Sequence, residues 1–452
     1  MAVSVVEGVR LPVLTGALMA TVAVASFVTT ATAALMPAIT TDIGGRSVYA
    51  LAFAVFTLAE LVALVAGARV CDTLGPVRSF LGGATAHVLG LVLAGVAGDF
   101  GWFLVGRFVQ GVGSGLVTVS VYVLVAQCYS EQQRTGMFAA MASAWAVPGL
   151  LGPVAGGLMS AAWTWRSVFL SVPVVELAAL VVVLPTLLVV QRTSVRRESV
   201  EPVAVRLLAA LVLAAGVVAV SCLRLFPESW TWPVLAGALL AIAFGVRPLV
   251  PAGTFRFARG LPTGILLRGF VGGFFSGAQY LLPLALSEGR GYSAVGAGLA
   301  LSCGVVGFSL GGLLQSRQQL TRIPVSTRMA VSLAALAAGM LITALGLDPD
   351  LPVVLAYAGW LVAGLGLGVA ITGLNLFVLE TAPEHERGAA SAAMRITDSI
   401  GNALMVAAGG LVIATTAVTG PSTARAAEWV TIVFALGMAA TATLARRLRG
   451  AS

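Results

Sequence analysis

Three acidic residues lie inside long apolar stretches of the chain, where an ionised side chain is costly. They are Asp398, Glu60 and Glu176. A carboxyl group shielded from water can take up and release a proton near neutral pH, because burial favours its neutral form. Asp398 is the first candidate for this chemistry, since it lies close to the middle of its stretch, and Glu60 and Glu176 follow. Each could instead be a structural partner in an ion pair or face water near a helix end.

Two arginines lie in the same kind of stretch. Arg395 precedes Asp398 by three residues, so on a helix the two share a face and can pair. Arg107 lies well inside another apolar stretch, where a guanidinium group needs an acceptor, water or a cavity. Beside a cavity, Arg107 could hold a neighbouring carboxylate in its ionised form. Alternatively, it could extend to the membrane surface.

The elements that position these residues are membrane-spanning helices. The chain has 452 residues, of which 59% are hydrophobic and 10% charged, whereas a soluble domain has about 25% charged residues. The apolar runs are solid rather than alternating and approach the length that crosses a bilayer, so an all-α polytopic membrane protein is predicted rather than a barrel. The net charge of +8 comes from arginines spread singly between these runs. It therefore indicates membrane topology, and no nucleic acid is expected as a partner.

Fourteen such stretches are predicted. They cover residues 12–36, 47–67, 79–98, 102–127, 137–160, 167–190, 207–223, 230–246, 262–286, 294–315, 327–346, 352–378, 389–416 and 427–445. With the N-terminus inside, nineteen arginines fall on cytoplasmic segments or helix ends, Arg268 among them, and five fall outside. Positive charge favours the cytoplasmic side, so both termini are predicted to lie in the cytoplasm, with the chain crossing the cell membrane repeatedly.

An internal repeat divides the chain. At an offset of 253 residues, 106–157 aligns with 359–410 without a gap, and 15 of the 52 positions are identical. The matches include Glu131 with Glu384 and Arg134 with Arg387, in a loop where composition alone does not explain them. The repeat predicts two six-helix halves in parallel orientation, with a binding site between them near the membrane midplane.

The offset is about 70 residues longer than one half, which is enough for two more helices and their loops. The predicted units are therefore 1–190 for the first half, 191–259 for an inserted pair (helices seven and eight), and 260–452 for the second half.

Three short motifs lie on the first half. The loop between the second and third stretches holds Asp72, Gly75 and Arg78, where glycine permits a tight turn. The fourth stretch combines Arg107 with Gln110, Gly111 and Gly113, and the fifth contains Gly152, Pro153, Gly156 and Gly157. Small residues at helical spacing let a neighbouring helix approach closely. An ordinary charged loop and plain packing glycines are the alternative interpretations.

With two halves of six helices and these motifs, the chain resembles the major facilitator superfamily, and the inserted pair resembles its fourteen-helix drug:proton antiporter branch. The loop is similar to G-x-L-A-D-R-x-G-R-R, the fourth stretch matches R-x-x-Q-G-x-G, and the fifth matches the core of G-x-x-x-G-P-x-x-G-G. The resemblance implies that the loop latches the two halves in one state and that the fifth-helix element belongs to exporters. One departure is Val28, which stands where that branch usually has an acidic residue in helix one.

The resemblance implies a secondary active transporter, in the first place a proton-coupled exporter of hydrophobic or amphipathic compounds that works by alternating access. An uptake symporter or a facilitator on the same fold is the alternative. A membrane enzyme is not expected, since only His87 and His385 are available and a GxxxxGK[ST] phosphate loop is absent. No metal or cofactor is expected. The expected partners are a small-molecule or lipid-like substrate, protons and the lipid bilayer, with the monomer as the working unit.

Overall fold

The computed structural model describes residues 10–193, 203–251, 253–315, 323–383, 387–419 and 423–448. Within them, fourteen helices are long and apolar enough to cross a membrane. They are α1 (Leu11–Asp42), α2 (Leu51–Leu74), α3 (Pro76–Gly95), α4 (Phe100–Cys128), α5 (Glu131–Ala162), α6 (Arg166–Thr193), α7 (Val203–Ser221), α8 (Glu228–Val246), α9 (Leu261–Arg290), α10 (Ala294–Gln315), α12 (Val325–Leu347), α13 (Val354–Thr381), α14 (Arg387–Thr419) and α15 (Thr423–Thr441). Short 3₁₀ turns are η1 (Arg46–Val48), η2 (Leu223–Leu225), η3 (Arg247–Leu249), η4 (Thr254–Arg256) and η6 (Ala442–Leu448).

The predicted all-α membrane fold with fourteen spans is confirmed, including the short seventh and eighth helices. Several helices extend beyond the apolar runs that predicted them. α5 begins at Glu131 rather than 137, because Ser130 and Gln133 form a capping box at its start. α1 continues through Pro37 to Asp42. Apolar content marks the membrane-embedded part of a helix, whereas capping residues decide where the helix begins.

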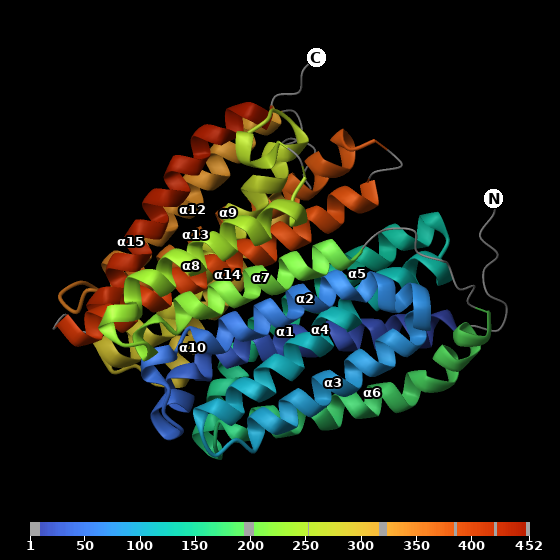
Figure 1. The fold of residues 1–452 in the computed structure, drawn as a ribbon, viewed down its shortest axis with the longest axis horizontal. Coiled ribbons are helices and arrows are strands. Elements are labelled where there is room, and N and C mark those ends of the chain that lie inside the picture. The colour runs from blue at the N-terminus through green and yellow to red at the C-terminus, as the bar shows by residue number, and fades with distance from the viewer. Residues whose placement is uncertain are drawn as a thin grey trace.

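The helices form two groups of six, with the α7–α8 hairpin beside them (Figure 1). The first group is α1–α6, and the second is α9, α10 and α12–α15. The hairpin packs along the seam, because one apolar cluster joins Leu58 and Leu61 of α2, Leu213 of α7 and Ile400 of α14. The segment 194–202 that leads into the hairpin, like Glu384 of the repeat, lies outside the described residues.

The glycines of the repeat make equivalent close approaches in both groups. A Cβ added at Gly111 would overlap the backbone of α2, and one at Gly364 would overlap that of α10. Likewise, Gly113 lies against the backbone of α3, and Gly366 against that of α12. These four glycines therefore set the same helix–helix spacing twice.

Because the number of spans is even, both ends of the described chain lie on one face of the bundle, here called the terminal side. On the opposite side, contacts join the two groups: Arg46 pairs with Glu288 at 2.6 Å, and the Tyr49 hydroxyl donates to the Tyr280 carbonyl oxygen at 3.0 Å. The Phe53 ring stacks on Tyr280 with centroids 4.0 Å apart. Figure 1 shows the two groups of ribbons diverging toward the end where both termini are marked.

Candidate functional site

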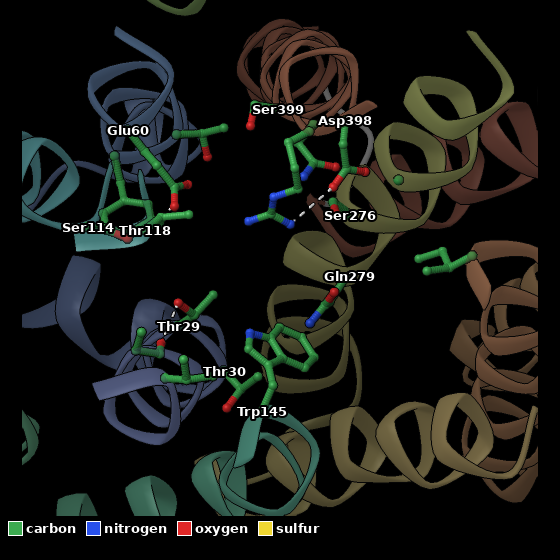
Figure 2. Close-up of a pocket in the computed structure, with 18 of the residues that line it drawn as sticks. Thr29, Thr30, Glu60, Ser114, Thr118, Trp145, Ser276, Gln279, Asp398 and Ser399 are labelled. Carbon is green, nitrogen blue, oxygen red and sulfur yellow. Dashed lines mark hydrogen bonds and ion pairs between the residues drawn. The ribbon is translucent and has the colours of Figure 1, made fainter. Parts of the chain in front are cut away.

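A cavity of about 570 Å³ lies between the two groups of helices. Its lining residues come from ten helices, α1–α6 with α9, α10, α13 and α14. The volume lies within the range of small-molecule sites. The lining mixes aromatic side chains with hydroxyl and amide groups, and Figure 2 shows Trp145, Gln279, Ser276 and Thr29 around the central space.

The cavity extends to the terminal side of the bundle. Its lining includes Tyr122 near the end of α4 and Asn375 near the end of α13, and both helices end on the terminal side. Toward the opposite side, the lining includes Tyr280, whose ring stacks on Phe53 and whose carbonyl oxygen accepts the Tyr49 hydrogen bond. The two helix groups are thus joined on the side opposite the termini and diverge on the terminal side (Figure 1).

The predicted acid Asp398 lies in the wall of this cavity, on α14 (Figure 2). Its nearest cation is Arg268 of α9, whose Nη2 lies 3.0 Å from Oδ2 of Asp398. Both residues are buried. The predicted partner Arg395 is farther away, at 3.9 Å, and its side chain is 47% exposed. Asp398 is thus held by two arginines, and the closer one comes from another helix.

The placement of Arg268 corrects the sequence analysis, which counted it among the cytoplasmic segments and helix ends. It lies eight residues into α9 and lines the cavity. Gly272, one turn further along α9, makes room for the pair, because a Cβ there would overlap the Asp398 carboxylate. In the sequence, an arginine followed by a glycine one turn later was the available signal for a buried ion pair at this position. The sequence does not show which acid this arginine pairs with.

Glu60 faces the same cavity from α2, across from Asp398 (Figure 2). One of its carboxylate oxygens accepts a hydrogen bond from the Ser114 hydroxyl of α4 at 3.0 Å. Within the described part of the chain, Glu60 forms no ion pair. The second helix group therefore contributes Asp398, which is paired with arginine. The first group contributes Glu60, which is bonded to a hydroxyl group, together with Glu176 of α6.

Glu176 and Arg107 belong to a chain of buried polar groups in the first helix group. Nδ1 of His87 lies 2.8 Å from a Glu176 oxygen, and its Nε2 lies 3.4 Å from the Gln110 amide nitrogen. Arg107 donates to the Gln110 side-chain oxygen at 2.6 Å and to the Ala52 carbonyl at 3.4 Å. All four side chains of this chain, Glu176, His87, Gln110 and Arg107, are buried.

Arg107 therefore meets amide and carbonyl oxygens. Its guanidinium also lies 4.3 Å from the centroid of the Phe56 ring. Among the described residues, no carboxylate lies within ion-pair distance of it, so the neighbouring acid considered for Arg107 is absent from this conformation. His87 is not identifiable as a functional candidate from the sequence, because a single histidine on an apolar helix carries no pattern.

The loop motif lies outside the cavity. Asp72 is in the last turn of α2 rather than between the helices, and Gly75 makes the turn with φ of +88° before Pro76 starts α3. A positive φ is accessible to glycine at little cost, as expected for this position. Within the described residues, Asp72 and the exposed Arg78 form no ion pair.

The motif of α5 packs against both helix groups. A Cβ at Gly152 would overlap α1 at Thr30, and one at Gly156 would press on Ala31. Gly157 faces Val295 of α10, and the Pro153 carbonyl lies against Gly298 of the same helix. The small residues on this face of α5 thus allow α1 and α10 to pack closely against it.

Val28 is buried in the apolar core. At this level of α1, the cavity side carries Thr29 and Thr30 instead (Figure 2). The acid that the related branch usually has in helix one is therefore replaced by a core residue, and the acids and arginines of this cavity come from α2, α6, α9 and α14.

A bundle of fourteen membrane helices with a polar and aromatic cavity between two six-helix groups defines a membrane transporter. The model of the Major Facilitator Superfamily matches residues 18–406. The chain therefore belongs to the major facilitator superfamily, a family of transporters that move small molecules across membranes, and the expectation that it is not an enzyme is confirmed.

Curated relatives are named as resistance proteins. The methylenomycin A resistance protein of Bacillus subtilis is 26% identical over 79% of this chain and 78% of its own length. The puromycin resistance protein pur8 of Streptomyces alboniger is 28% identical over 78% of this chain and 71% of its own. The resemblance to drug-efflux members of the family is thus confirmed at low identity.

Solved structures share the fold. An auto-inhibited peptide transporter of the POT family superposes with a TM-score of 0.69 at 16% identity, over 97% of this chain and 98% of that one. The POT family transporter PepTSo superposes with a TM-score of 0.67 at 14% identity, over 96% and 98%. At this identity the similarity concerns the fold alone.

Proposed function

We propose that this protein is a proton-coupled exporter of hydrophobic or amphipathic compounds that works by alternating access. The observation that carries the proposal is the pair of carboxylates, Glu60 and Asp398, facing one aromatic-lined cavity from opposite helix groups. A proton and a substrate can compete for such a cavity. The names of the relatives support export rather than uptake.

In the proposed cycle, the terminal side faces the cytoplasm, so the described conformation is open inward. Arg268 is paired with Asp398 here, and in the proposed cycle Asp398 has released its proton into the cytoplasm in this state. The vacated cavity then accepts the substrate. When the cavity opens outward, Asp398 takes up a proton again and the substrate is released.

The proposal treats 1–190 and 260–452 as the two moving halves, with 191–259 as an inserted pair beside the seam. It places a monomer in the cell membrane with both termini in the cytoplasm.

Cysteine labelling tests the sidedness: after replacement of the four native cysteines, a Pro227→Cys variant should react with an impermeant reagent from outside. Reaction only from the cytoplasm would reject this topology.

The coupling test uses proteoliposomes with an imposed pH gradient and a lipophilic fluorescent dye that the wild-type protein expels. Asp398→Asn keeps the shape but removes the titratable group, so gradient-driven transport should fall to the level of empty vesicles while the protein stays folded. Glu60→Gln, beside Ser114, is the matched variant on the other wall. Undiminished transport in Asp398→Asn would reject Asp398 as the proton carrier, and dye movement into the cytoplasm with protons would favour the alternative of an uptake symporter.

A further inference from the structure

A second cavity, of about 490 Å³, lies outside the central one, between α8, α9 and α14. Here it is called the outer groove. Its walls are apolar side chains from the three helices, among them Ile242 and Val246 of α8, Leu266 and Phe270 of α9, and Ile400 and Leu404 of α14. Arg247 is the one charged residue of its lining.

The outer groove reaches from the terminal side to the middle of the bilayer. On α9 its lining runs from Leu266 to Phe270, and Phe270 lies about 14 Å from the start of the helix. On α14 its lining runs from Thr397 to Met405. Half of the hydrocarbon core of a bilayer measures roughly 15 Å. Arg247, directly after the last residue of α8, therefore lies at the level of the lipid headgroups on the terminal side, and the apolar part lies at the level of the acyl chains.

The rim of the outer groove is basic. The connector from α8 to α9, residues 247–260, contains Arg247, Arg256 and Arg259 and no acidic residue. All three arginines are exposed, and in the described part of the chain none of them pairs with a carboxylate. The Arg247 guanidinium lies 5.5 Å from the centroid of the Phe244 ring. This surface lacks a counter-charge and is suited to an anion.

The connector is held in one shape. Phe257, which lines the groove with Phe255, has φ of 52°, a left-handed conformation that is costly for a bulky residue. Its carbonyl accepts a hydrogen bond from Arg447 at 2.8 Å, and the Gly260 amide donates to the Arg447 carbonyl at 3.0 Å. The end of the described chain thus fixes the rim before any ligand binds.

We propose that the outer groove binds an anionic phospholipid, with one acyl chain along α9 and α14 and the phosphate on Arg247. Apolar walls at acyl depth and an unpaired arginine at headgroup depth match the two parts of such a lipid. The groove adjoins the Asp398 site. Two of its lining residues, Gly269 and Thr397, respectively directly follow Arg268 and directly precede Asp398 in the chain. The backbones of Gly269 and Gly401 are also in contact. A bound lipid therefore stabilises the seam that carries the ion pair.

The test uses the purified full-length protein in detergent, with phosphatidylglycerol or phosphatidylcholine of identical acyl chains added. Phosphatidylglycerol should be retained in native mass spectra and should raise the thermal unfolding midpoint more than phosphatidylcholine does. Arg247→Gln should weaken phosphatidylglycerol binding roughly fivefold, the effect of one arginine near a lipid surface, whereas Arg192→Gln, an exposed arginine at the end of α6, should not. Ala243→Trp, which fills the groove but leaves the rim intact, should reduce retention as well.

Three results would overturn the proposal. Equal retention of both lipids would show ordinary solvation by the bilayer. An unchanged affinity in Arg247→Gln would place the anion elsewhere. A thermal shift reproduced by inorganic phosphate alone, and insensitive to Ala243→Trp, would show an anion site that does not use the groove.

Discussion

The two walls of the central cavity share a backbone design but differ in chemistry. On the wall of the first helix group, Glu60 meets only a hydroxyl group. Glu176 ends a chain of buried polar groups that runs through His87 and Gln110 to Arg107. On the wall of the second group, Asp398 lies between Arg268 and Arg395. The first wall thus carries carboxyl groups that are hydrogen-bonded rather than paired with arginine. The second wall carries two arginines and one carboxylate.

The repeat shows where the difference arises. The aligned glycines of α4 and α13 make the same close approaches, yet Arg107 aligns with Trp360 and Asp398 aligns with Trp145. Both planar groups pack against a phenylalanine ring. The Arg107 guanidinium carbon lies 4.3 Å from the centroid of the Phe56 ring, and the Trp360 and Phe275 ring centroids are 4.6 Å apart. Helix packing therefore requires the small residues in both copies, whereas the larger side chains at aligned positions are free to diverge.

Removing Arg268 should have the largest effect, because it breaks the charged wall. Arg268→Ala leaves the buried Asp398 without its nearest cation, which is expected to lower the free energy of unfolding by about 3–5 kcal/mol. Transport should be lost as well. Thermal unfolding in detergent and dye transport would be measured together.

The double variant Arg268→Ala with Asp398→Asn is the control for this prediction. It removes the charge left behind, so it should recover most of the stability but no transport. A single Arg268→Ala variant with wild-type stability would mean that Arg395 alone neutralises Asp398.

The glycines test the shared part of the two walls. Gly111→Ala and Gly364→Ala each place a Cβ on a neighbouring helix backbone, so each should lower stability by roughly 1–3 kcal/mol through overpacking. Because the approaches are equivalent, the two losses should be similar in thermal unfolding. Gly136→Ala, where a Cβ meets open space, is the control. A large loss at only one of the two sites would contradict equivalent packing.

Arg107 tests the chain of buried polar groups in the first helix group. Arg107→Lys keeps the charge but loses the planar group that reaches Gln110 while covering Phe56. Transport should fall much more than stability. In Arg107→Ala, the Gln110 oxygen loses its donor, and stability should fall as well, by about 1–3 kcal/mol. Normal transport by the lysine variant would show that Arg107 supplies charge only.

Glu176 should show the smallest effect. Glu176→Gln keeps a hydrogen-bonding group opposite His87, so the loss of stability should stay within about 1 kcal/mol. Gradient-driven transport should continue if Glu176 is a structural partner. Abolished transport in a stable Glu176→Gln protein would assign the proton site to the first wall instead of to Asp398 on the second.

The sequence by itself determined the membrane architecture. Fourteen spans follow from apolar length, because each helix must satisfy its backbone in lipid and does so locally. The close approaches of Gly111 and Gly113 were also predictable, since small residues at helical spacing have one main use in a membrane. Asp398, Glu60 and Glu176 were identifiable as candidates, because a charge inside an apolar run is unusual wherever the helix packs.

Only the tertiary structure decided which charges meet. Arg268 and Asp398 are 130 residues apart, and Arg268 was assigned to the helix ends because its distance from the membrane surface along α9 permits either position. His87 gained a role only through Glu176 and Gln110, on two other helices. The local sequence records the cost of burying a charge, but its partner is chosen by the packing of distant helices, and that choice gives the two walls their different chemistry.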